Sequence, residues 1–174
     1  GTNNPTFTFT LSDPDVSDTD KYQIQIDDSS NFASPVVDYT SALAAEGART
    51  FTVGQATGTG TYTAGFAGQT LSDTSYYWRV KAIDAASAES SYSTANGGSM
   101  AFVVDTAVRT AQFLANALSA SETVTATSIH IVLNTTHFEN VTVAYAVSGG
   151  TATGDGTDYT LAAGTATITA GQTS

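Results

Sequence analysis

The chain has 174 residues, with 16 acidic and 5 basic side chains and a net charge of −11. Nucleic-acid binding needs clustered Lys and Arg to neutralise phosphates, so this charge balance excludes DNA and RNA as partners and disfavours an anionic membrane surface. No apolar run approaches the roughly 18–20 residues of a membrane-spanning helix, so we expect no membrane insertion.

Composition favours β-structure. Threonine, whose branched Cβ suits a pleated surface, occurs 31 times and serine 18 times, while charged residues make up 12% of the chain. Threonine and serine hydroxyls therefore replace much of the charge that usually solvates a surface. Cysteine is absent, which excludes disulfides, thiol nucleophiles and zinc–thiolate sites.

The first half of the chain alternates apolar and polar residues with a period of two, which is typical of half-buried strands. Thr6–Leu11 and Lys21–Asp27 show this pattern, and in the second of these Tyr22, Ile24 and Ile26 are expected to face inward. Three weaker strand predictions follow: Val36–Tyr39, Arg49–Val53 and Gly60–Ala64.

The strongest strand prediction is Tyr76–Asp84, where Tyr76 and Trp78 are expected to face inward and Tyr77 outward. A further strand is expected at Ala101–Asp105. Turn-forming residues separate all these segments, and short strands at regular spacing indicate an antiparallel sandwich.

The second half predicts three more strands, at Thr123–Leu133, Val141–Val147 and Thr165–Thr169. The alanine-rich stretches Ala42–Ala45 and Ala111–Ala120 favour single helical turns. We place the domain boundary in residues 105–109. The predicted fold class is all-β, with two tandem antiparallel β-sandwiches spanning residues 1–105 and 106–174.

Residues 5–105 resemble a bacterial fibronectin type III-like domain. The resemblance rests on Pro5–Phe9, Asp13–Asp15, Tyr22–Ile26 and the run from Leu71 through Asp84. It implies that the tyrosine opening this strand forms a corner in which the hydroxyl bonds upstream backbone while the ring joins the core. Parity favours Tyr76 for this role, with Tyr77 as the next candidate, and Leu71 and Trp78 are further structural residues. In the family another strand normally precedes the one at Phe7–Leu11.

Residues 111–174 are similar to the first part of a Calx-beta domain, a calcium-associated sandwich. Phe113, Ser121–Glu122, Val141–Tyr145, Gly150–Tyr159 and Gly164–Thr165 carry the similarity. The family continues with two more strands and an acidic pair beyond the point matched by Ser174. Both sandwiches are therefore expected to lack edge strands, so that the chain is either a fragment of a longer protein or a protomer completed by a neighbour's strands.

Two acidic groups are candidate calcium ligands. Close carboxylates supply the oxygens that Ca²⁺ prefers, and the densest set is Asp13, Asp15, Asp18 and Asp20. Its spacing does not match an EF-hand loop, and a solvated turn with capping Asp side chains is the favoured interpretation. The Calx-beta resemblance implies Glu122 and Asp158 as a second set of ligands, and Asp155 is close enough to assist them.

No motif predicts catalysis. The chain has no G-x-S-x-G elbow, no phosphate-binding glycine loop and no histidine pair at metal-ligand spacing. His130 and His137 are the only histidines, and His130 is expected to be structural. Tyr39, Tyr77 and Tyr92 are candidates for stacking on sugar rings if they are exposed.

The expected function is a non-enzymatic structural or adhesion module of a larger bacterial surface or filament-forming protein, located outside the cell or on its surface, with calcium stiffening it where a site is complete. Its partners would be neighbouring domains of the same chain, identical subunits, glycans or a cell-surface receptor. Two alternatives stay open: a self-assembling filament subunit completed by a neighbouring strand, and a carbohydrate-binding accessory module of a secreted enzyme.

Overall fold

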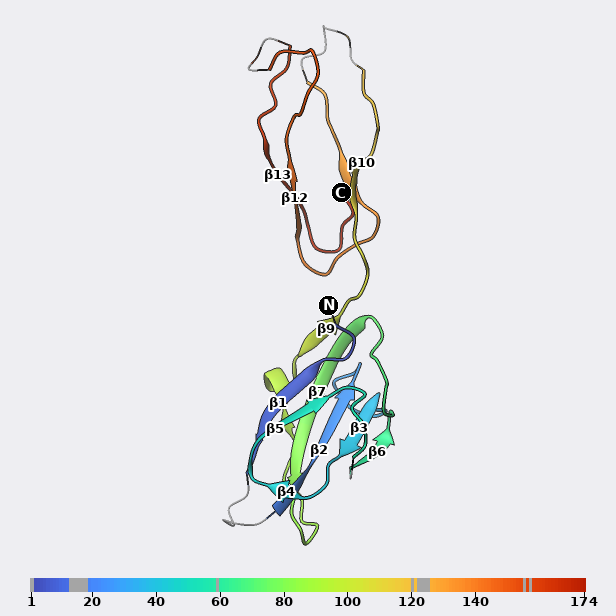
Figure 1. Ribbon diagram of the computed structural model, residues 1–174, viewed down its shortest axis with the longest axis vertical. Coiled ribbons are helices and arrows are strands. Elements are labelled where there is room, and N and C mark those ends of the chain that lie inside the picture. The colour runs from blue at the N-terminus through green and yellow to red at the C-terminus, as the bar shows by residue number, and fades with distance from the viewer. Residues whose placement is uncertain are drawn as a thin grey trace. The chain divides into compact units, whose positions relative to one another are not determined.

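A computed structural model describes residues 2–12, 19–58, 60–119, 121, 126–154, 156 and 158–174. In these ranges the chain is all-β with one short 3₁₀ segment, and it forms two compact units, Gly1–Thr106 and Ala107–Ser174 (Figure 1). The boundary between the two units lies between Thr106 and Ala107.

The first unit contains nine strands, most of them short. Their bounds are β1 Thr6–Leu11, β2 Thr19–Asp27, β3 Val37–Thr40, β4 Ala44–Ala45, β5 Gly47–Thr52, β6 Thr61–Ala64, β7 Thr74–Ile83, β8 Ser93–Thr94 and β9 Phe102–Val104, with the 3₁₀ segment at Ala95–Gly98.

These strands form two antiparallel sheets. β1 pairs with β5, and the larger sheet has the order β6-β3-β2-β7-β8, with β4 added to β2 and β9 added to β7 (Figure 1). The longest pairing joins β2 to β7 over seven residues, from Lys21 opposite Ile83 to Asp27 opposite Tyr77. This pairing is the centre of the larger sheet, because all its other strands attach to β2 or β7 directly or through β3.

One apolar core lies between the two sheets. Phe51 of the smaller sheet and Ile24, Ile26 and Val37 of the larger sheet are fully buried in it. The alternation in β2 places Ile24 and Ile26 in this core and turns Gln23 and Gln25 to the other face. The inward side chains expected from the sequence are thus where the pattern predicts, and both sheets contribute to a β-sandwich-like core.

The second unit contains four short strands in two antiparallel pairs. β10 (Ala111–Phe113) pairs with β11 (Ile131–Leu133), and β12 (Val141–Tyr145) pairs with β13 (Gly164–Ile168). Among its described residues only Leu133 and Ile168 are buried apolar side chains. This unit therefore has a far smaller apolar core than the first.

Three local predictions were wrong. Ala44–Ala45 and Ala111–Phe113 are strands rather than helical turns, because Ala44 pairs with Asp20 and Ala111 with Leu133. Helix propensity is a weak preference that sheet pairing overrides. Of the strand expected over Thr123–Leu133, residues 131–133 form β11 and residues 126–130 are not in a strand, while residues 123–125 lie outside the described residues.

Candidate functional site

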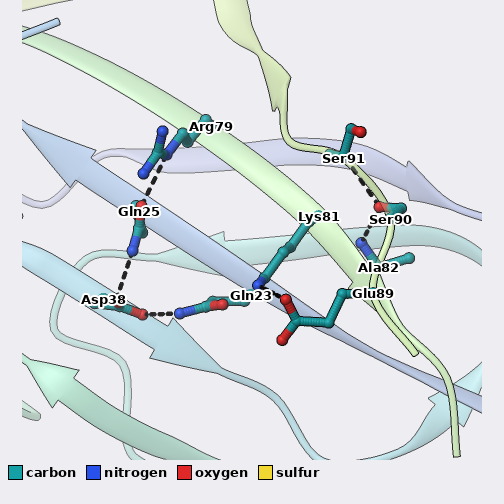
Figure 2. Close-up of polar contacts among 9 residues, drawn as sticks. All are labelled: Gln23, Gln25, Asp38, Arg79, Lys81, Ala82, Glu89, Ser90 and Ser91. Carbon is teal, nitrogen blue, oxygen red and sulfur yellow. Dashed lines mark hydrogen bonds and ion pairs between the residues drawn. The ribbon is translucent and has the colours of Figure 1, made fainter. Parts of the chain in front are cut away.

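The outer face of the larger sheet in the first unit carries a connected set of polar side chains (Figure 2). Asp38 of β3 accepts hydrogen bonds from Gln23 Nε2 at 2.7 Å and Gln25 Nε2 at 2.6 Å, both from β2. Gln25 in turn accepts a hydrogen bond from Arg79 Nε of β7 at 2.8 Å. The network therefore crosses three adjacent strands through side chains, in addition to the backbone ladders.

The register of the sheet explains this network. Gln25 is paired directly with Asp38 on one side and with Arg79 on the other, and all three occupy outward positions. Only 8% of Gln25 and 8% of Asp38 is exposed. Buried polar groups are costly unless they are hydrogen-bonded, and here both oxygens of the Asp38 carboxylate have an amide donor.

Two aromatic rings hold the Arg79 guanidinium. Its Cζ atom lies 4.3 Å from the ring centroid of Phe32, in the β2–β3 connection, and 4.0 Å from that of Tyr92, just before β8. Such cation–π contacts are favourable, more so where water is excluded. Phe32 is 7% exposed and has a φ of 52°, in the left-handed region that a bulky residue rarely adopts. The sequence did not single out Phe32, because nothing in its local pattern places it over Arg79.

Lys81 occupies the next outward position of β7 and forms an ion pair with Glu89 (Figure 2). Its Nζ atom also lies 5.1 Å from the ring centroid of Tyr92. Burial raises the pKa of the Tyr92 hydroxyl, and the negative charges of Asp38 and Glu89 raise it further, against the opposing effect of Arg79. Tyr92 is therefore a neutral hydroxyl at neutral pH, beside two cationic side chains.

The structural residues of the sequence prediction all contribute to the apolar core of the first unit. The Tyr76 hydroxyl donates to Ser72 O at 3.1 Å, four residues upstream, and its ring is 2% exposed, which is the contact that the fibronectin type III resemblance implies. Leu71 is buried and donates its backbone N–H to Asn3 O at 2.7 Å. Trp78 is half-buried, with its ring centroid 5.1 Å from that of Phe7.

The expected calcium ligands fall mainly outside the described residues, namely Asp13, Asp15, Asp18, Glu122 and Asp155. Asp20 is described and is fully buried, which differs from the solvated turn expected for its group. Asp158 accepts a hydrogen bond from Thr153 N through Oδ2 at 2.7 Å. No group of three or more potential metal ligands occurs among the residues that the structure describes, so these residues alone do not make a calcium site.

The second unit contains an open groove of about 660 Å³. Its apolar lining includes Phe113, Leu118, Ile129 and Leu161, which are 54%, 56%, 52% and 41% exposed. His130 lines the same groove as its neighbours Ile129 and Ile131. The groove shows that this unit leaves much apolar surface uncovered.

The three tyrosines named as sugar-stacking candidates differ in exposure. Tyr39 is buried, with 4% exposed, and its hydroxyl donates to Thr57 O at 3.1 Å, so its ring is not available for stacking on a sugar. Tyr77 and Tyr92 are half-buried on the outer side of the sheet. The parity of β3 explains the difference, because it alternates Tyr39 toward the core with the outward Asp38.

Comparison with known proteins gives no relatives: no family model, no curated protein and no solved structure matches the chain. None of the described segments forms a helix with the length and apolarity needed to cross a membrane. No relative therefore assigns a function to the polar and aromatic surface around Arg79 or to the groove of the second unit.

Proposed function

We propose that the chain is a non-enzymatic structural and adhesion module of a larger extracellular bacterial protein. The observation that carries this proposal is the side-chain network from Asp38 through Gln25 to Arg79. It links β3, β2 and β7 across the face of a sheet that the backbone already joins. Polar side chains used in this way brace a sheet, and a braced sheet resists separation of its strands when the chain is under tension.

The proposal is tested by pulling the 174-residue chain from its two ends in a single-molecule force experiment. We expect a distinct rupture of the first unit, whose release adds roughly 350 Å of chain at about 3.4 Å per residue. Asp38→Ala, which removes the acceptor of two amides, should lower the rupture force. Glu89→Ala, which removes only an exposed partner of Lys81, should leave it nearly unchanged. Extension without a rupture peak would contradict a load-bearing role.

Calcium is part of this proposal on the strength of the Calx-beta resemblance. Asp158 Oδ1 has no hydrogen-bond partner among the described residues, and the sequence suggests Glu122 and Asp155 as its fellow ligands. An ion that binds only the folded state stabilises it by mass action. A melting scan with calcium should give a higher midpoint than one with a chelator, and Asp158→Asn should reduce the difference. Equal midpoints would remove calcium from the proposal.

A second candidate function, a self-assembling filament subunit, is favoured by the groove of the second unit. The exposed side chains of Phe113, Leu118 and Ile129 offer an apolar floor for an extended strand from another copy. Light scattering across a concentration series tests it, with salt added to screen the repulsion between chains of charge −11. Growth of assemblies that Leu118→Asp abolishes would support this function. A monomer at all concentrations would exclude it.

A further inference from the structure

Arg79 has hydrogen-bonding capacity that the protein does not use. Its Nε atom donates to Gln25, but its two terminal amino groups donate to none of the described residues, and Arg79 makes no ion pair with any of them. This is unusual in a chain where 16 acids face 5 bases. Its neighbour Lys81, by contrast, is already paired with Glu89.

The surroundings of Arg79 restrict how a ligand can approach it. Phe32 and Tyr92 lie over the guanidinium at 4.3 and 4.0 Å, and the Gln25 bond fixes its Nε edge. The two terminal amino groups, in the plane of the guanidinium, have no acceptor among the described residues. A carboxylate binds there through two parallel hydrogen bonds, a geometry that a lysine cannot offer.

The groups around Arg79 indicate which kind of ligand carries the carboxylate. Thr94 of β8 is exposed and pairs in register with Arg79, so its hydroxyl lies on the same face of the sheet as the cation. The Tyr92 hydroxyl lies on the same side of the sheet. One available cation surrounded by neutral hydroxyls matches a ligand that carries one carboxylate among hydroxyls of its own. Several closely spaced carboxylates would instead be repelled by the net charge of −11.

We propose that the outer face of the larger sheet binds a uronic-acid residue of a glycan, with its carboxylate held by the terminal amino groups of Arg79. This assignment rests on the proposed adhesion role and names the ligand class for it. Phe32 and Tyr92 act as positioning residues, since they hold the guanidinium in place. The left-handed backbone at Phe32 is consistent with this role, because strained residues persist where the surrounding structure requires them.

The test is an NMR titration of the full 174-residue chain with methyl glucuronide. Methyl glucoside serves as the matched sugar without a carboxylate, and N-acetylglutamate amide as the carboxylate without a sugar ring. We expect the glucuronide to shift amide signals in β2, β7 and β8, the glucoside to shift none, and the glutamate derivative to bind several-fold more weakly.

Substitutions locate the site. Arg79→Gln should weaken glucuronide binding by roughly tenfold or more, because it removes a charge-assisted pair of hydrogen bonds. Arg79→Lys keeps the positive charge but cannot form two parallel hydrogen bonds to a carboxylate, so it should also lose most of the binding. Arg49→Gln is the matched control, since it makes the same change on β5 in the other sheet. The dispersion of the amide spectrum checks that each variant is folded.

The assignment would be overturned by an absence of shifts with the wild type, by equal binding of glucoside and glucuronide, or by equal binding by wild type and a folded Arg79→Gln variant. Equal binding of the glutamate derivative would indicate an acidic peptide in place of a glycan and would also overturn it. If binding fails while the rupture peak of the first unit persists, only the ligand is wrong and the structural role is retained.

Discussion

The hydroxyl of Tyr76 donates to the carbonyl of Ser72 at 3.1 Å, closing a turn that leads directly into β7. The bond matters for the rest of the molecule because Tyr76 lies near the start of β7, which pairs with β2 at the centre of the larger sheet. Its ring stacks on Phe102 of β9, with the centroids 5.4 Å apart. The turn and the last strand of the unit are thus fixed by one side chain.

Tyr76→Phe should lower the free energy of unfolding by about 1 kcal/mol, the usual worth of one hydrogen bond. The ring contacts remain, so the fold is retained. Tyr77→Phe is the control, because its hydroxyl bonds none of the described residues and the change should stay within about 0.5 kcal/mol. Urea unfolding measures both variants, and equal effects would show that the Tyr76 bond contributes nothing specific.

Phe51→Ala should be far more damaging. Phe51 is fully buried between the two sheets, and removal of such a ring costs about 3–5 kcal/mol through lost burial and the cavity left behind. Phe66→Ala makes the same chemical change at a side chain that is 64% exposed and should cost less than about 0.5 kcal/mol. A comparison of the two urea midpoints tests where the core lies.

Asp38→Ala should cost about 1–3 kcal/mol, because the amide groups of Gln23 and Gln25 both lose their acceptor in a nearly buried place. Glu89→Ala breaks the ion pair with Lys81, but the Glu89 side chain is 53% exposed. Ion pairs at such positions contribute about 0–1 kcal/mol. If the two variants lose equal stability, the network does not brace the sheet.

Stability should fall as the pH rises through about 10. Burial raises the pKa of Tyr22, Tyr62 and Tyr76 above the ordinary value of 10.0, and the carboxylates of Asp28 and Asp73 add to the effect at Tyr76. Above pH 10 the unfolded chain therefore releases these protons first, which favours unfolding. Urea midpoints measured from pH 7 to 11 should be level to about pH 9 and then decline. A midpoint that is unchanged at pH 11 would contradict this prediction.

The unfolding transition should be checked against tyrosine ionisation itself. Absorbance at the tyrosinate wavelength should show that some tyrosines of the folded chain ionise at a higher pH than the others. In urea all the tyrosines should ionise over the same pH range. Tyr62→Phe should remove one late group, since the Tyr62 hydroxyl donates to Gln55 O at 3.0 Å in the folded state. Titration curves that coincide in the folded and unfolded chain would remove tyrosine as the cause.

The sequence by itself determined the all-β class and the side-chain parity of the main strands. Alternation with a period of two is a local property, so Ile24 and Ile26 could be assigned to the core and Gln25 to the outer face without a structure. The ends of short strands could not be assigned in this way. Ala44–Ala45 and Ala111–Phe113 have helix-favouring alanines, and only their pairing partners make them strands.

The candidate site was decided by tertiary structure. Arg79 and Gln25 are 54 residues apart in the chain, and Phe32 and Tyr92 reach the same guanidinium from two separate connections. No local pattern encodes such a meeting, because register and loop path fix it. The sequence could show that Arg79 faces outward, but only the folded sheet shows that two rings lie beside it and that its terminal amino groups bond none of the described residues.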